Sequence, residues 1–282
     1  MVERRPLLDA LAYAVLALGV AVVVFPVYVT FVASTQTFEQ IVHVPMSLLP
    51  GRELVSNYLT ALSAGTEQAA HTPVGHMMLV SFIVALVVPA GKIVISLLSA
   101  FAVVYFRFPG RMLFFWMIFV TLMLPVEVRI VPTYAVVANL HLLNTYAGLI
   151  LPLVASATAT FLFRQVFMTI PDELAEAARM DGAGPMRFFW DVLVPLSRTN
   201  MAALFVILFI YGWNQYLWPL LVTTEESMYP VVIGIRRMIA GGDAATQWNI
   251  VMATAMLAML PPALVVLLMQ RWFVKGLVET EK

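Results

Sequence analysis

Six long apolar stretches separated by polar segments dominate the pattern of this 282-residue chain. They cover approximately residues 10–33, 77–106, 112–131, 142–163, 200–222 and 248–270. A helix of about 20 apolar residues crosses the roughly 30 Å core of a bilayer, whereas barrel strands would alternate with a period of two over about ten residues. The pattern therefore predicts an all-α integral membrane protein with six transmembrane helices.

The amino-acid composition agrees with a membrane protein. Hydrophobic residues make up 62% of the chain, charged residues 11%, and the mean hydropathy is +0.92, which leaves too little polar surface for a soluble globule. The net charge is zero, so we expect no nucleic-acid partner, and the charge total does not indicate the cargo. The absence of cysteine excludes a disulfide scaffold, a thiolate metal site and a Cys nucleophile.

The orientation in the membrane follows from the Lys and Arg residues of the loops, because cytoplasmic loops are enriched in them. If the N-terminus is cytoplasmic, eleven of the sixteen basic residues fall in inside segments and four in outside segments, with Lys92 inside a span. The bias predicts that both termini are cytoplasmic. It also places the polar segment 169–198 in the cytoplasm and a long segment, about 34–76, outside.

The polar segment 169–198 is expected to form two short helices joined by a tight bend. Pro171 suits the first position of a helix over residues 172–180. On this helix Leu174, Ala177 and Ala178 share one face.

The signals that end these helices are Asp181 with Gly182, and Pro195. Gly182 can adopt the positive φ of a C-terminal cap. Pro185 then opens a second helix, which we expect Pro195 to end. Periodicity alone leaves open an ordinary amphipathic helix lying on the membrane surface.

The same segment carries a more specific pattern. Glu176-Ala177-Ala178, followed by Gly182, Val192 and Pro195, resembles the EAA loop of permease subunits of bacterial ABC importers; it departs from the family at Val194, where Leu is usual. The resemblance implies that residues 172–184 dock as a coupling helix in a cleft of a cytoplasmic ATPase. It also implies that Glu176 pairs with a basic residue of that ATPase and that Gly182 permits the bend. The coupling residues expected from the resemblance are Glu176, Ala177, Ala178, Asp181, Gly182 and Pro195.

The chain carries no phosphate-binding loop of the P-loop type. Gly91-Lys92-Ile93 lacks both the upstream Gly and the hydroxyl residue, and it lies in a span. ATP must therefore be hydrolysed by another subunit. We expect a non-catalytic transport subunit that binds no cofactor itself, with ATP and Mg on the partner ATPase.

Similarity to a narrower class covers roughly residues 77–270. The segments that look like carbohydrate-type permeases of the maltose-importer class are 98–102, 107–111, 124–128, 144–149 and 163–165. Within this class, three runs are most similar to permeases of sn-glycerol-3-phosphate importers, namely 114–129, 155–165 and 211–221. The resemblance implies ATP-driven uptake of sn-glycerol 3-phosphate or glycerophosphodiesters, and a sugar or polyol is the alternative cargo.

The resemblance also implies a set of partners and a place in the cell. The chain would be a single permease domain over residues 1–282 in the bacterial inner membrane, in contact with lipid. Its partners would be a homologous second permease, an ATPase dimer and a periplasmic solute-binding protein. The family mechanism is alternating access, in which closure of the ATPase dimer moves the coupling helices.

Polar residues inside the apolar stretches are candidates for the substrate path. Placing the charged side chain of Lys92 at mid-membrane depth costs about 2.5–3.5 kcal/mol. Lys92 therefore either lines the path of a phosphorylated substrate or is a buried cation paired with a carboxylate or with helix-end carbonyls. Glu127 and Arg129 would form a gate, an ion pair with a partner subunit, or a solvated rim. Asn214 and Gln215 could bind a polyol or sugar, and hydrogen bonds between helices explain them nearly as well.

Two other classes of protein compete with this interpretation. A secondary transporter would usually show two repeated halves, and none is visible in the sequence. An intramembrane enzyme would need a nucleophile set, a metal motif or paired carboxylates in the spans. The four histidines offer no pair at positions i and i+4, so we expect no metal site.

Overall fold

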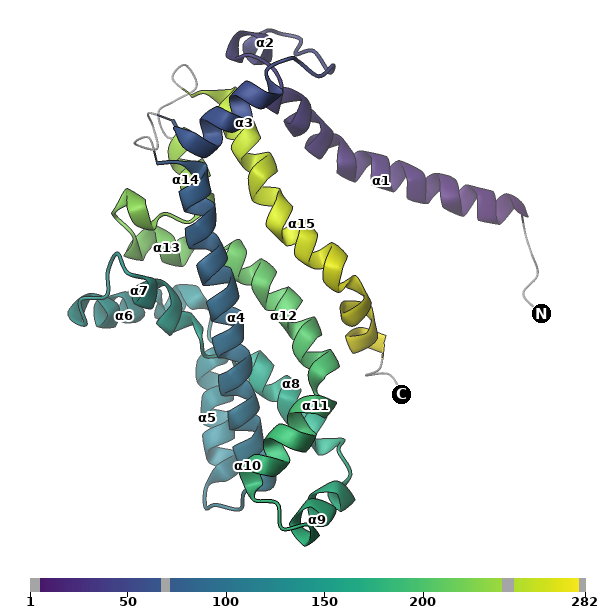
Figure 1. Cartoon of the computed structure of the whole chain (residues 1–282), viewed down its shortest axis with the longest axis vertical. Coiled ribbons are helices and arrows are strands. Elements are labelled where there is room, and N and C mark those ends of the chain that lie inside the picture. Colours follow the sequence, from purple (N-terminus) through teal and green to yellow (C-terminus); the bar gives the residue numbers. More distant parts are fainter. Residues whose placement is uncertain (1–5, 67–71, 240–245, 279–282) are drawn as a thin grey trace. The chain divides into compact units, whose positions relative to one another are not determined.

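The computed structural model describes residues 6–66, 72–239 and 246–278, and within these ranges the chain forms helices and no strand (Figure 1). Side chains are described in these ranges except at positions 6, 122, 126, 127 and 272–278. The helices are α1 (Pro6–Ser34), α2 (Phe38–Val42), α3 (Leu54–Ser63), α4 (Val74–Tyr105), α5 (Arg111–Met123), α6 (Val126–Asn139), α7 (Tyr146–Ile150), η2 (Leu151–Leu153), α8 (Ala157–Met168), α9 (Asp172–Met180), α10 (Pro185–Phe188), η3 (Phe189–Leu193), α11 (Val194–Leu196), α12 (Arg198–Trp213), α13 (Leu217–Val222), η4 (Glu226–Met228), α14 (Val231–Ile239) and α15 (Trp248–Val278).

Three helices in the described part of the chain are long and apolar enough to cross a membrane: α1, α4 and α15 up to Arg271. Two bent pairs of helices reach that length together. Residues 146–153 and 157–168 meet at 49°, and residues 185–196 and 198–213 meet at 71°. By length and composition the described residues therefore hold three spans, or up to five if each bent pair is one span.

Three of the six predicted stretches are interrupted where we expected continuous helices. The stretch 112–131 breaks at Leu124, which takes an extended ψ of 135° before Pro125, because proline disfavours helical backbone in the residue before it. Figure 1 shows α6 turning away from the line of α5. The stretch 142–163 begins as helix only at Tyr146 and breaks before Ala157.

The third interruption divides the stretch 200–222 at residues 214–216, between α12 and α13. Prolines alone do not decide where a helix breaks. Pro26, Pro89 and the pair Pro261-Pro262 lie inside α1, α4 and α15, because neighbouring groups in a membrane helix can satisfy the carbonyls that a proline frees.

The chain divides into two compact units, and the first comprises residues 1–76 and 234–260. Its centre is Asn57 of α3, which is 4% exposed. The Asn57 Nδ2 donates to the carbonyls of Ser34 (3.0 Å) and Gln36 (2.9 Å), and the Asn249 Nδ2 donates to the Asn57 Oδ1 at 2.8 Å. One side chain thus joins α3, the end of α1 and the start of α15.

The surface of α1 indicates its environment. More than half of each large apolar side chain from Leu7 to Phe25 is exposed in the isolated chain. Apolar exposure of this extent is a surface for lipid or for another subunit.

The second unit comprises residues 77–233 and 261–282 and holds two hydrophobic cores. One core joins the N-terminal half of α4 to α6, α7 and α13. The other joins the C-terminal half of α4 to α8, α10, η3 and α12. A Cβ on Gly212 of α12 would lie 3.2 Å from the Ala85 Cα of α4, so this glycine permits a close crossing of the two helices.

Candidate functional site

The polar segment between α8 and α12 contains α9, which spans Asp172–Met180 as the sequence predicts. Asp172 and Glu173 lie in its first turn and Arg179 in its last, where the helix dipole favours each charge. Pro171 differs by one position from the expectation, since its ψ of 137° makes it the N-cap rather than the first helical residue.

The predicted positive φ at Gly182 is confirmed, at 72°. The Gly182 N–H donates to the Arg179 carbonyl at 3.0 Å, and the Ala183 N–H donates to the Ala178 carbonyl at 2.8 Å. These are the two hydrogen bonds of a Schellman motif. Beyond Gly182 and its two chain neighbours, no atom lies within 4 Å of the position a Cβ would take, so backbone conformation, rather than space, calls for glycine here.

The packed face of α9 agrees with the predicted face at Ala178 and differs from it at Leu174 and Ala177. Ala175 and Ala178 pack against the second hydrophobic core, whereas Leu174 is 41% exposed and Ala177 is exposed. Residues three or four positions apart share a helical face, so the sequence of α9 allows more than one apolar face. The position of the neighbouring helices decides which of these faces packs.

The exposed face of α9 and its cap carry four of the six residues that resemblance marks as coupling residues. Glu176, Ala177, Asp181 and Gly182 are exposed. Ala178 is half-buried and faces the core. The site therefore has an outer surface free for a partner and an inner surface held by the bundle.

Pro195, the sixth residue, does not end the second helix, contrary to the prediction. The helix begins at Pro185 as expected, passes through a π-helical turn over Phe189–Leu193 and continues to Leu196. In the wider turn the Val194 N–H donates to the Phe189 carbonyl, an i→i+5 bond. Such a turn admits a proline, which lacks an N–H, without loss of the helix.

An aromatic cluster connects this segment to the bundle. It consists of Phe101, Tyr105, Phe167, Phe188 and Phe189, from α4, α8, α10 and η3. Ring centroids of Tyr105 and Phe188 lie 5.2 Å apart, those of Phe101 and Phe189 5.0 Å, and those of Tyr105 and Phe167 6.2 Å. The five rings therefore form one contiguous contact between the segment and the bundle.

Two cavities lie between α9 and the end of α4. One, of about 270 Å³, is lined by Phe101, Arg107, Ala178 and other residues. The second, of about 210 Å³, includes Asp172 and Glu176. The contact between α9 and the bundle is therefore carried by a few side chains rather than by a continuous interface.

Lys92 is buried in the second unit, with 7% of its surface exposed. Its Nζ lies 4.6 Å from the ring centroid of Tyr211 of α12, which is the geometry of a cation–π interaction. Among the side chains that the structure describes, no carboxylate forms an ion pair with Lys92. The structure thus gives this cation an aromatic neighbour in place of a carboxylate.

Arg129 lies on α6, half-buried beside a small cavity of about 30 Å³ that Thr133 and Trp218 also line. The side chain of Glu127 lies outside the described residues, and its backbone is in the first turn of α6. Asn214 and Gln215 lie in the break between α12 and α13. Asn214 is exposed, and the Gln215 Nε2 donates to the Tyr211 carbonyl at 3.3 Å. No hydrogen bond or ion pair between described side chains joins these candidates to one another.

The described residues include no group of three His, Asp or Glu side chains that could hold a metal ion. The chain has no cysteine.

The sequence analysis did not predict a set of hydrogen bonds made by Asn144. Asn144 adopts a φ of 56°, and its Oδ1 accepts from the N–H groups of Thr224 (2.6 Å) and Glu225 (3.1 Å). Its own N–H donates to the Val222 carbonyl at 3.0 Å. The asparagine thereby ties the segment before α7 to the segment after α13. The only local signal was asparagine itself, which tolerates positive φ more readily than other residues.

These features match a known class of membrane proteins. The sequence profile of the family described as "Binding-protein-dependent transport system inner membrane component" matches residues 92–279. The chain belongs to this family. It is an inner-membrane component of a transport system, with helices long and apolar enough to span a membrane.

Several related proteins that share the same name match this chain over its whole length. The proteins named "sn-glycerol-3-phosphate transport system permease protein UgpE" are 61% identical in Brucella melitensis biotype 1, 62% in Agrobacterium fabrum and 60% in Yersinia pestis bv. Antiqua. Each alignment covers 282 residues and 100% of both chains.

A solved structure shares the fold. It is the crystal structure of a bacterial ABC transporter involved in the import of the acidic polysaccharide alginate, with a TM-score of 0.75 and 20% sequence identity. The alignment covers 97% of this chain and 99% of the other. The chain therefore has the fold of an ABC importer permease.

Proposed function

We propose that this chain is one of two permease subunits of an ATP-driven importer of sn-glycerol 3-phosphate or glycerophosphodiesters. The observation that carries the proposal is identity of 60–62%, over the full length of both chains, to permeases named for sn-glycerol-3-phosphate transport. A homologous second permease, an ATPase dimer and a periplasmic solute-binding protein complete the proposed system.

In the proposed topology one permease domain extends over residues 1–282, with its core at about 77–270, and crosses the membrane six times. The spans are α1, α4, α5, the α7–α8 pair, α12 and α15, with both termini in the cytoplasm. The distribution of Lys and Arg supports this orientation. It places the segment with α9 on the cytoplasmic side and the segment between α1 and α4 outside.

In the proposed mechanism the outer face of α9 docks on the ATPase, which alone binds ATP and Mg, so this chain is non-catalytic. Glu176 pairs with a basic residue there, and Ala177 allows close approach. The Schellman cap at Gly182 keeps α9 rigid. Motion of the ATPase then passes through Ala175 and Ala178 to the aromatic cluster, and from it to α4 and α8, which supports alternating access.

The proposed substrate path includes Lys92, whose charge suits a phosphorylated cargo, with Glu127, Arg129, Asn214 and Gln215 as further candidates. The buried position of Lys92 without a carboxylate partner among the described side chains supports this assignment. A cation kept in an apolar bundle is costly, which points to a role in transport.

The test is uptake of labelled sn-glycerol 3-phosphate by cells that lack this chain, with and without its restoration. Unlabelled glycerophosphodiesters, maltose and polyols serve as competitors. We expect restored uptake that only glycerol phosphates compete. Restoration of sugar or polyol uptake instead, with this chain in the membrane, would move the cargo to the alternative class.

A further inference from the structure

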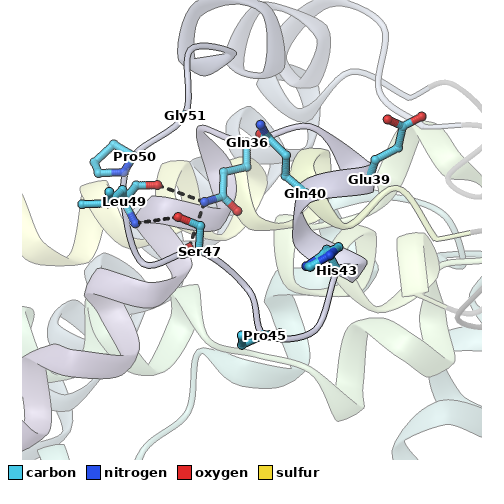
Figure 2. Close-up of a pocket in the computed structure, with 9 residues that line it drawn as sticks. All are labelled: Gln36, Glu39, Gln40, His43, Pro45, Ser47, Leu49, Pro50 and Gly51. Atoms are coloured by element: carbon cyan, nitrogen blue, oxygen red, sulfur yellow. Dashed lines mark hydrogen bonds between the residues drawn. The ribbon is translucent and has the colours of Figure 1, made fainter.

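Gln36 is a buried polar side chain that ties together the segment after α1. Its Nε2 donates to the carbonyls of Ser47 (2.9 Å) and Leu49 (3.0 Å), as Figure 2 shows. Its Oε1 is buried without a hydrogen-bond partner, and the carboxylate of Glu39 points away from it. Since only 2% of its surface is exposed, Gln36 is a structural tie that no ligand reaches.

Lys92 of α4 differs from Gln36, because solvent still reaches its charged group. The side chain keeps 7% of its surface exposed, and its ammonium nitrogen is not sealed off. No residue in the described part of the chain accepts a hydrogen bond from it. Instead, the Nζ lies 4.6 Å from the ring centroid of Tyr211. The face of an aromatic ring attracts a cation but has no formal charge, so this contact holds the ammonium group without neutralising it.

This contact lies where the two hydrophobic cores of the second unit meet. On α4, Val88 belongs to the first core and Ile93 to the second, and Lys92 stands between them in the sequence. Neither Lys92 nor Tyr211 is part of either core. A cation inside a membrane helix is costly, so its position at this junction calls for a function that uses the charge.

The ring of Tyr211 owes its position to the packing of α12 on α4. A Cβ on the next residue, Gly212, would lie 3.2 Å from the Ala85 Cα. Ala85 and Lys92 are seven positions apart and therefore share one face of α4. The Gln215 Nε2 also donates to the Tyr211 carbonyl at 3.3 Å. The close crossing and this hydrogen bond fix the backbone that carries the ring beside Lys92.

A second positive charge acts on Lys92. It belongs to Arg129 of α6, which repels the ammonium group. Among the side chains that the structure describes, no carboxylate forms an ion pair with either cation. Two cations in this state attract an anion more strongly than a neutral molecule.

We propose that Tyr211 is a positioning residue of the substrate path, whose ring keeps the Lys92 ammonium group unneutralised until a phosphorylated cargo takes the place of the ring. An anion makes charge-assisted hydrogen bonds with an ammonium group, which are stronger than hydrogen bonds with the hydroxyl of a sugar or polyol. A neutral cargo therefore gains little by displacing the ring, and a phosphate ester gains more. The inference rests on the proposed function, and the substrate path proposed above does not include Tyr211.

The test uses the complete transporter in proteoliposomes, with the purified solute-binding protein that supports uptake by the wild type. The measured quantity is the amount of labelled sn-glycerol 3-phosphate taken up for each ATP hydrolysed. We expect Tyr211→Leu to lower this ratio about tenfold. The rate of ATP hydrolysis itself should stay within about twofold of wild type, because the coupling segment is unchanged. A merely structural defect would lower hydrolysis and uptake together.

Two further tyrosine variants separate the ring from other effects. Tyr211→Phe keeps the ring face and removes the hydroxyl, so we expect it to retain at least half of the wild-type ratio. Tyr216→Leu is the matched control, because Tyr216 is 38% exposed and Tyr211 41% exposed. It removes a tyrosine ring five positions away, and we expect a ratio within about twofold of wild type.

A double variant tests whether Tyr211 acts through Lys92. Lys92→Met leaves the ring no cation to hold. Adding Tyr211→Leu to Lys92→Met should therefore lower the ratio by less than about twofold, against about tenfold when Lys92 is present.

A wild-type ratio in Tyr211→Leu, an equal fall in Tyr211→Phe or Tyr216→Leu, or a further tenfold fall in the double variant would overturn the inference. The proposed function fails separately. It fails if the wild type takes up no sn-glycerol 3-phosphate with any solute-binding protein, and this inference then falls with it.

Discussion

Substitution of Gly182 tests the coupling segment through backbone conformation alone. The residue has a φ of 72°, and beyond its two chain neighbours no other residue has an atom within 4 Å of the position of a Cβ. Gly182→Ala therefore adds no clash, and its cost is that of an L-residue in left-handed conformation, about 1–2 kcal/mol. We expect reduced uptake with normal insertion in the membrane.

Gly182→Pro is expected to abolish uptake. Proline fixes φ near −65°, removes the N–H that donates to the Arg179 carbonyl at 3.0 Å, and disfavours the conformation of Asp181 before it. The cost therefore exceeds the roughly 1–2 kcal/mol expected for Gly182→Ala. The Schellman cap cannot form in this variant.

Gly184→Ala is the matched control, because Gly184 has a φ of −71° and also has open space around it. The assay is ATP-dependent uptake in proteoliposomes, normalised to the amount of each variant in the membrane, with co-purification of the ATPase. We expect the order Gly184→Ala, Gly182→Ala, Gly182→Pro from most to least active. Normal uptake by Gly182→Pro would refute the reasoning, and so would equal damage from the two alanine variants.

Three further predictions concern other positions. Glu176→Lys should detach or uncouple the ATPase because it reverses an exposed charge on α9; unchanged co-purification together with unchanged uptake would contradict the role of Glu176. Lys92→Met should lower uptake of sn-glycerol 3-phosphate while preserving or raising thermal stability in detergent, because it removes a buried cation without a carboxylate partner among the described side chains; undiminished uptake would remove Lys92 from the substrate path. Gly148→Ala should lower the yield of folded protein, because a Cβ there would overlap the Leu142 carbonyl oxygen; Gly19→Ala, at a position with no atom within 4 Å, is its control in size-exclusion chromatography.

The sequence alone determined the features that depend on neighbouring residues. The membrane character follows from the length and apolarity of the stretches. The bounds of α9 and the positive φ of Gly182 follow from Pro171, from the acidic first turn and from the properties of glycine, all within one short segment. Such signals are local, because a helix cap involves only residues within about five positions of one another.

The tertiary structure decided which of several locally allowed arrangements occurs. Pro26 lies inside a helix while Leu124 before Pro125 breaks one, and Pro195 lies within a helix that a π turn accommodates. Local sequence permits either outcome at a proline, because the result depends on whether other groups satisfy the freed carbonyls.

Contacts between distant segments were likewise beyond the sequence. The face of α9 that packs, the Tyr211 ring beside Lys92, the Asn144 hydrogen bonds and the unmet oxygen of Gln36 each depend on residues that meet only in the folded chain. A sequence states which side chains can make such contacts. Packing selects among them, because each buried group must find a partner in the space that the surrounding helices leave.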